Sequence, residues 1–322
     1  MSIFRRPGAI AAESRRWTFA FPRSELNLSL SDHSKALSKS TTRPAKWLRR
    51  GRSAIAATSV VGCLALGWLW WTAPRPHPPQ VVYPGITYAC TRDDKPEIAG
   101  LVHVVTVDLS KPGLDLYITP LDPDAVDAGW EYRSCWLPRV VATEDLVVGI
   151  NATFFEKDVP WWVVWSGHWA RSLETIVADH QVNHVDPNSY LLWFDDRLSP
   201  HLETTKPPPK EALNRARWGI AGQMVLLDKG RVSKFARHDV DARTAIGFST
   251  FPNTLYLAAF EHASEHRVGE LLAEVGATEA ILLDGGDSSC FVFGPKAQCA
   301  SRRSVVFPRQ AHVTVFGVRD SR

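Results

Sequence analysis

Apolar runs broken by turn residues dominate the sequence after residue 95 and predict a structure rich in strands. The run Leu101–Leu109 is separated from Leu114–Thr119 by Lys111-Pro112-Gly113, a pattern typical of a hairpin. A second hairpin is predicted around Asp228-Lys229-Gly230 and a third around Ser166-Gly167. The remaining expected strands cover 147–151, 161–165, 169–171, 220–227, 231–235, 242–248, 255–260, 280–283 and 313–318.

One segment has the period of a helix. Apolar residues recur at i, i+3, i+4 and i+7 from Val268 to Val275, and Gly276 can end the helix. Strand, helix and strand between Leu255 and Leu283 would form a crossover unit with two parallel strands. The expected fold class is therefore α+β, as one mixed, sheet-dominated globular domain over 95–322.

The segment Ser53–Thr72 is uncharged over about twenty residues, the length that a helix needs to cross a bilayer. Basic residues precede it and three tryptophans lie near its end, which favours an anchor with its N-terminus in the cytoplasm. A cleaved signal peptide and a buried core helix are the alternatives. We expect a single-pass membrane protein whose main domain is periplasmic or extracellular.

Composition changes sharply before this segment. Residues 1–52 hold 12 Lys/Arg against 3 Asp/Glu, which leaves 25 against 31 for the rest of the chain. The tail is polar and reads as disordered, whereas 73–94 reads as a proline-rich linker. The basic excess belongs to the tail, so nucleic-acid binding by the main domain is disfavoured.

Four of the five cysteines lie beyond the apolar segment, and an even number in an oxidising compartment suggests disulfides. Three pairings of these four are possible. We predict Cys290–Cys299 and Cys90–Cys135, with buried free thiols as the alternative. The spacing typical of cysteine zinc sites is absent from the sequence.

Polar residues at the ends of apolar strands are the candidates for chemistry. The strand 280–283 runs into the loop 284–289, where consecutive glycines allow a sharp turn and close approach of a ligand to the backbone. Asp284 stands where this strand ends, so it could act as a base, a nucleophile or a metal ligand. The other candidates are Asn151, Arg243, Glu261 and His262, each at the start or end of an expected strand.

Each candidate also has a structural interpretation. The Asn151 amide could bond the backbone, and Arg243 could form an internal ion pair with Asp241. A serine-hydrolase site is disfavoured, because Ser288 and Ser289 are followed by an apolar strand and not by the helix of a GxSxG elbow.

Several motifs, in this order, resemble the phosphodiester glycosidase family. They are NATFF at 151–155, ARTAIGFS at 242–249, LYLAAFEH at 255–262, LLDGGDSS at 282–289 and VTVFGV at 313–318. Family members usually carry NGGFF and DGGGSS, so Ala152, Thr153 and Asp287 stand where glycines are usual.

The resemblance implies hydrolysis of the glycosidic bond in a sugar-1-phosphodiester or a related anionic glycan. Asp284 would be the base or nucleophile, Arg243 would hold the phosphate, and Glu261 would be the second carboxylate. The residues that would contact the substrate are Asn151, Gly285, Gly286, Ser288, Ser289 and His262. Asp287 could bind a divalent cation, Ca²⁺ by preference, and no other cofactor is expected.

Two alternatives to a glycosidase remain open on the same fold. One is a non-catalytic protein that binds a glycan or assembles an envelope polysaccharide. The other is a metal-dependent phosphodiesterase that cleaves the P–O bond. The expected partners are a glycan or sugar-phosphate substrate and, through residues 53–72, a membrane.

Overall fold

The computed structural model describes residues 75–93, 95–160, 162–163, 165–298 and 311–321. The chain divides into the units Met1–Gly62 and Cys63–Arg322, and all described residues belong to the second unit. Within these described ranges, no helix is long and apolar enough to cross a membrane. The predicted tail at 1–52 and anchor at 53–72 lie outside the described residues and stay predictions.

An eight-stranded sheet organises the domain, and all its neighbouring strands pair antiparallel. Its order is β1 (His77–Tyr83), β2 (Ile86–Arg92), β3 (Ile98–Asp108), β17 (Thr254–Ser264), β16 (Val240–Ser249), β18 (Glu279–Leu282), β14 (Val225–Asp228) and β15 (Arg231–Val232). Strands β1 and β2 fall in the segment that we predicted to be a linker. The prediction that the domain begins at residue 95 is therefore wrong, because alternate residues of β2 such as Ile86 and Tyr88 are buried in the core.

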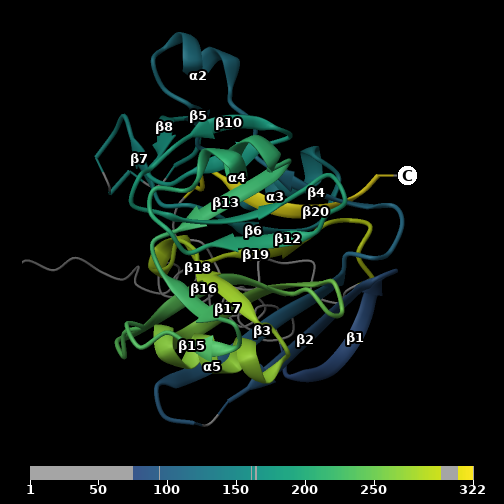
Figure 1. Cartoon of the computed structure of the whole chain (residues 1–322). Coiled ribbons are helices and arrows are strands. Elements are labelled where there is room, and N and C mark those ends of the chain that lie inside the picture. The colour runs from purple at the N-terminus through teal and green to yellow at the C-terminus, as the bar shows by residue number, and fades with distance from the viewer. Residues whose placement is uncertain (1–74, 94, 161, 164, 299–310, 322) are drawn as a thin grey trace, which may run out of the picture. The chain divides into compact units, whose positions relative to one another are not determined.

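Helix α5 (Glu265–Glu274) covers one face of this sheet, as Figure 1 shows. Its Ser264 cap accepts a hydrogen bond from the Arg267 backbone N–H, and Val268 and Leu272 pack under the sheet against Phe260. Burying two such side chains contributes about 3–6 kcal/mol. The predicted helix is confirmed. The crossover β17–α5–β18 is also confirmed, since both strands pair antiparallel with β16 between them and are therefore parallel to each other.

Three smaller sheets lie on the other side of the eight-stranded sheet (Figure 1). The first is β10 (Gln181–His184), β9 (Ile176–Ala178), β13 (Trp218–Gly222), β11 (Tyr190–Phe194) and β12 (Pro200–Glu203). The second is β19 (Phe291–Phe293), β6 (Leu146–Asn151), β20 (Val315–Asp320) and β4 (Leu114–Ile118), and the third is β5 (Tyr132–Arg133), β8 (Trp169–Ser172) and β7 (Phe155–Lys157). Ile246 and Ile281 of the large sheet share one core with Val148, Phe194 and Phe316.

The predicted hairpins have mixed outcomes. The hairpin of β14 and β15 is confirmed, and its turn residues Lys229 and Gly230 both have positive φ, as a type I′ turn requires. The hairpin at 101–119 is wrong, because β3 and β4 belong to different sheets. Near Ser166-Gly167, β8 pairs with β7 and β5, and residues 161 and 164 of the expected strand 161–165 lie outside the described residues. The shorter helices are α2 (Pro123–Asp127), α3 (Leu137–Thr143), α4 (Lys210–Arg215) and the 3₁₀ turn η1 (Gly286–Ser288).

The Cys90–Cys135 disulfide that we predicted is not formed. Cys90 pairs across the sheet with His103, whereas Cys135 forms an isolated bridge with His312, so strand pairing holds the two cysteines in different places. Cys299 lies outside the described residues, and its pairing with Cys290 stays a prediction.

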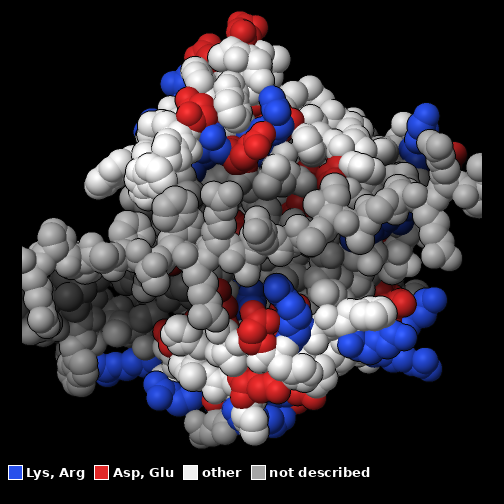
Figure 2. Space-filling model, turned by 90° about the vertical axis from the view of Figure 1, so that its left-hand side faces the viewer, with Lys and Arg blue, Asp and Glu red and all other residues white. Residues whose placement is uncertain are grey.

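Acidic and basic side chains lie close together over the described parts of the face shown in Figure 2. A group of ion pairs fixes the segment before β3 to α5. The buried Arg267 pairs with Asp93, Glu270 and Glu274, and Lys95 also pairs with Glu274. The β2–β3 connection is therefore held against the helix by charge.

Candidate functional site

The loop 284–289 leaves the sheet at the end of β18. The Leu283 N–H still donates to Thr244 on β16 at 3.0 Å, but the next N–H, of Asp284, donates to Ala152 after β6 at 2.9 Å. The chain thus passes from the large sheet to the four-stranded one at this point. The geometry favours glycine here: Gly286 has a φ of +58°, and a Cβ on Gly285 would lie 3.0 Å from the Ala242 carbonyl oxygen. The conformation of the loop is set by these glycines and backbone bonds.

Asn151 holds both ends of this loop. Its amide nitrogen donates to the Asp284 carbonyl oxygen at 2.6 Å and to Thr244 Oγ1 at 3.1 Å, and its Oδ1 accepts from the Cys290 N–H at 2.9 Å. Both amide hydrogens are used inside the protein. The structure therefore gives Asn151 a positioning role, where the sequence led us to expect a contact with sugar hydroxyls.

Thr153 explains one departure from the usual family motif. Its hydroxyl lies 2.9 Å from Ser172 Oγ and 2.7 Å from Thr314 Oγ1, and all three groups are buried. A glycine could not make these bonds. The threonine ties the segment after β6 to the end of β8 and to the chain before β20.

Asp284 carries the most informative side chain of the loop. It is 7% exposed, and burial raises the pKa of its carboxyl from 3.8 to about 7, against the lowering effect of hydrogen bonds from Ser288 and Gly285. Near neutral pH both protonation states of this carboxyl are populated. A group with this pKa can exchange protons with a substrate in either direction.

Glu174 is a second buried carboxyl beside Asp284, and the sequence analysis missed it. It follows β8, has no exposed surface, and accepts the Phe154 N–H on Oε2 at 3.2 Å. Burial raises its pKa well above the ordinary value, and the nearby Asp284 carboxylate raises it further. Its Oε1 has no hydrogen-bond partner in the described structure. The sequence gives only a lone acid between two short strands, which is a weak signal.

Arg243 lies on β16 next to the loop. The pairing of β16 with β18 ends at Ala245 and Leu282, and the Thr244 hydroxyl, next to Arg243, donates to the Asp284 carbonyl oxygen at 2.6 Å. A Cβ added to Gly285 would be 3.7 Å from both Cδ and Nη1 of Arg243. Its Nη2 donates to Asp239 at 2.8 Å, while its buried Nε has no partner among the described residues. The expected internal partner, Asp241, is thus replaced by Asp239.

His312 and Ser289 complete the group around the loop. His312 Nε2 donates to the Ser288 carbonyl oxygen at 2.8 Å, and burial lowers the pKa of the ring to about 4, so the ring is neutral. The described structure offers no partner to His312 Nδ1 or to Ser289 Oγ. Four buried side chains next to this one loop therefore keep an unsatisfied polar atom, and each such atom costs about 1–3 kcal/mol. This concentration marks the loop as a place where a polar ligand would be stabilised.

Other predicted residues lie elsewhere. Glu261 accepts the Leu101 N–H at 2.8 Å at an irregular pairing of β17 with β3, and His262 is exposed on the same strand. The second carboxyl beside Asp284 is therefore Glu174 and not Glu261. Asp287 is exposed, and the group of described residues with metal-site geometry does not include it.

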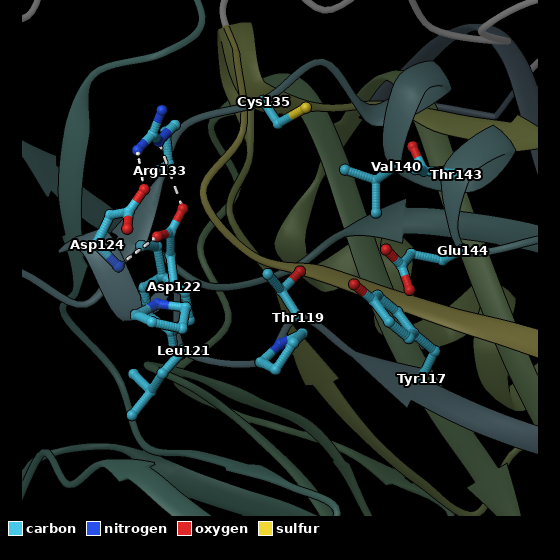
Figure 3. A pocket seen from close by; sticks show the side chains of 13 residues that line it. Tyr117, Thr119, Leu121, Asp122, Asp124, Arg133, Cys135, Val140, Thr143 and Glu144 are labelled. Carbon is cyan, nitrogen blue, oxygen red and sulfur yellow. Dashed lines mark hydrogen bonds and ion pairs between the residues drawn. The ribbon is translucent and has the colours of Figure 1, made fainter. Parts of the chain in front are cut away.

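A cavity of about 380 Å³ opens in another part of the domain. Figure 3 shows the Arg133 side chain paired with Asp122 and Asp124 on one side of it, and Tyr117 and Glu144 on the other. None of the residues of the loop 284–289 lines this cavity. It is therefore distinct from the candidate site.

Comparison with known proteins places the chain in a family. Residues 144–317, more than half of the chain, match the model of the phosphodiester glycosidase family. The chain belongs to this family, as the order of its motifs suggested. A search of curated protein sequences found no match.

Two solved structures share the fold. A hypothetical protein from Synechocystis has a TM-score of 0.58 at 13% identity over 75% of this chain and 64% of its own, so this chain spans less than two thirds of it. The catalytic domain of zebrafish N-acetylglucosamine-1-phosphodiester alpha-N-acetylglucosaminidase, auto-inhibited by its pro-peptide, has a TM-score of 0.55 at 16% identity over 76% of this chain and 88% of that domain.

Proposed function

We propose that this protein hydrolyses the glycosidic bond of a sugar-1-phosphodiester or a related anionic glycan. One observation carries the proposal: the buried carboxyls of Asp284 and of Glu174, which follows β8, interact and both have raised pKa, and the neighbouring Gly285 lies against Arg243 of β16. Glycosidases use a pair of carboxyl groups in which one accepts and one supplies a proton. Family membership points to the same reaction class.

The roles follow from the environment of each group. Asp284, with a pKa of about 7, is the base or nucleophile, and Glu174, whose pKa burial raises well above the ordinary value, supplies or shares a proton. Arg243 holds the phosphate, for which a guanidinium is well suited. Ser288, Ser289 and the loop N–H groups add hydrogen bonds to the substrate. A phosphomonoester is a weakly basic leaving group, so it needs less protonation than the alcohol of an ordinary glycoside.

The location is a further part of the proposal. The uncharged segment 53–72 and the basic residues before it favour an anchor that places the domain outside the cytoplasm. Fusions of a periplasm-specific and a cytoplasm-specific reporter to the C-terminus test this topology, and activity of the cytoplasmic reporter alone would reject it.

The reaction is tested with purified protein and a sugar-1-phosphodiester in ¹⁸O-labelled water. Label in the released sugar supports cleavage of the C–O bond, whereas label in the phosphate indicates the alternative phosphodiesterase. Arg243→Ala and Glu174→Gln should each lower kcat/KM by about a hundredfold or more, since each removes a group acting on the reacting atoms. Binding of the glycan without turnover would leave a glycan-binding protein as the function.

The Ca²⁺ hypothesis at Asp287 remains a prediction. If a cation joins the Asp287 carboxylate to the substrate, chelation stops turnover and added Ca²⁺ restores it in the wild type but not in Asp287→Asn. Turnover that ignores chelation excludes this role.

A further inference from the structure

Three segments far apart in the sequence bring together metal-binding side chains that are not part of the loop 284–289. Glu97 precedes β3, His238 precedes β16, and His266 lies in the first turn of α5. One ligand atom from each lies within 4.8 Å of the others. His238 Nδ1 is 2.8 Å and 3.0 Å from the two carboxylate oxygens of Glu97, and the two histidine rings stack with centroids 4.9 Å apart.

The backbone around this group is fixed by other contacts. Glu97 has a φ of 66°, a left-handed conformation that is rare for a glutamate. Ser264 maintains this conformation: its N–H donates to the Glu97 carbonyl oxygen at 2.9 Å and its hydroxyl donates to Glu97 Oε2 at 2.6 Å. The His266 N–H donates to the Arg237 carbonyl oxygen at 3.1 Å, which sets the neighbouring His238 beside α5. Small side-chain movements are then enough to close the three groups on an ion.

The donor set indicates which ions fit. Two imidazoles and one carboxylate are typical ligands of Zn²⁺ and of neighbouring transition metals, whereas Ca²⁺ and Mg²⁺ prefer oxygen ligands alone. His238 is 64% exposed at its side chain, so a fourth position stays open to solvent. Glu270 Oε1 lies 3.9 Å from His266 Nδ1 and can orient this ring from outside the ligand set.

We propose that Glu97, His238 and His266 form a binding site for a divalent transition metal of the Zn²⁺ type. The ion joins the segment before β3, the segment before β16 and the helix α5, so it cross-links three parts of the chain that are far apart in the sequence. This proposal does not depend on the catalytic activity.

The test uses the full-length protein, stripped of metal, in calorimetric titrations with ZnCl₂ and in absorption spectra with Co²⁺. We expect the wild type to bind one Zn²⁺ per chain with high affinity at Glu97, His238 and His266, and its Tm to rise when Zn²⁺ is added. His238→Ala and Glu97→Gln should each weaken this binding by about tenfold or more, since even residues outside the ligand set change metal affinity tenfold. Because His238 is exposed, His238→Ala should fold as the wild type does, and circular dichroism checks this.

His180 provides a matched control. Its ring Nε2 lies 3.0 Å from Asp196, so it is an exposed histidine paired with one carboxylate and with no second imidazole in the group. His180→Ala should bind Zn²⁺ as the wild type does. The proposal is overturned if the wild type, His238→Ala and Glu97→Gln bind Zn²⁺ with equal stoichiometry and affinity. It is also overturned if the wild type does not bind Zn²⁺. In either case the three residues form an ionic cluster without a metal.

Discussion

Replacing Asp284 by Asn should stabilise the protein at neutral pH. Burial raises the pKa of this carboxyl from 3.8 to about 7 in the folded protein. Between about pH 4 and pH 7 the folded state therefore keeps a proton that the unfolded chain releases, and stability falls as the pH rises through this window. Each pKa unit corresponds to about 1.4 kcal/mol, so a shift of roughly three units costs the fold about 4 kcal/mol above pH 7. The neutral amide of the Asn variant avoids this cost.

The measurement is the free energy of unfolding in urea for wild type and Asp284→Asn at pH 4.5 and at pH 8. The variant's free energy of unfolding minus that of the wild type should grow by about 3 kcal/mol from pH 4.5 to pH 8, since most of the range between the two pKa values lies in this interval. Asp287→Asn, three positions along the same loop, removes an exposed carboxylate and should leave the Asp284 slope in place. If the difference in free energy of unfolding between Asp284→Asn and the wild type is equal at both pH values, the raised pKa of the buried Asp284 carboxyl is refuted.

Three further predictions concern other parts of the domain. Burial lowers the pKa of His103 to about 3, so the folded protein does not take up the proton that the unfolded chain binds below pH 6.5. The free energy of unfolding should therefore fall by about 2 kcal/mol from pH 6.5 to pH 5 through this group. Urea titrations in which His103→Gln loses as much stability over this pH range as the wild type would contradict this. Gly222→Ala places a Cβ 2.2 Å from the Leu282 carbonyl oxygen and should lower the free energy of unfolding by about 2 kcal/mol or more. A calorimetric Tm equal to that of the wild type would disprove this. Arg243→Lys keeps the charge but loses the guanidinium fork, so kcat/KM on a sugar-1-phosphodiester should fall about tenfold or more; steady-state kinetics unchanged by the substitution would argue against a phosphate contact.

Much of the large sheet could be predicted from local pattern. The strands at 242–248 and 255–260 and the helix after them are read from continuous apolar runs and a 3.6-residue period, and these features depend on neighbouring residues alone. The loop 284–289 was recognisable for the same reason, since two glycines and two acids interrupt an apolar run. Local signals were therefore enough to predict the loop of the candidate site.

Residues that depend on tertiary packing could not be found in this way. Glu174 is buried because the segments after β6 and β8 meet, and nothing in its own neighbourhood shows that it lies near Asp284. Glu261 was chosen because it follows an apolar strand, but an irregular pairing turns its carboxylate to the Leu101 N–H. Strands β1 and β2 were missed because prolines at their start are typical of a linker, whereas pairing with β3 decides their structure.

Asn151 was predicted to be a site residue, but its contacts differ from those that the sequence suggested. The polar side chain at the end of β6 was correctly marked as unusual, since a buried amide must be bonded. Its partners are the two ends of the loop, 133 and 139 positions away in the sequence. The sequence could predict that this residue matters but not which contacts it makes.

The central claim is that Asp284 and Glu174, and not Glu261, form the reacting carboxyl pair. The most direct measurement is kcat/KM on a sugar-1-phosphodiester for Asp284→Asn, Glu174→Gln and Glu261→Gln, with the fold of each variant checked by its Tm. We predict a loss of about a hundredfold or more for the first two, as for removal of a group that transfers a proton in the transition state, and a change within about threefold for the third. Wild-type turnover in Asp284→Asn, or a loss confined to Glu261→Gln, would contradict the account.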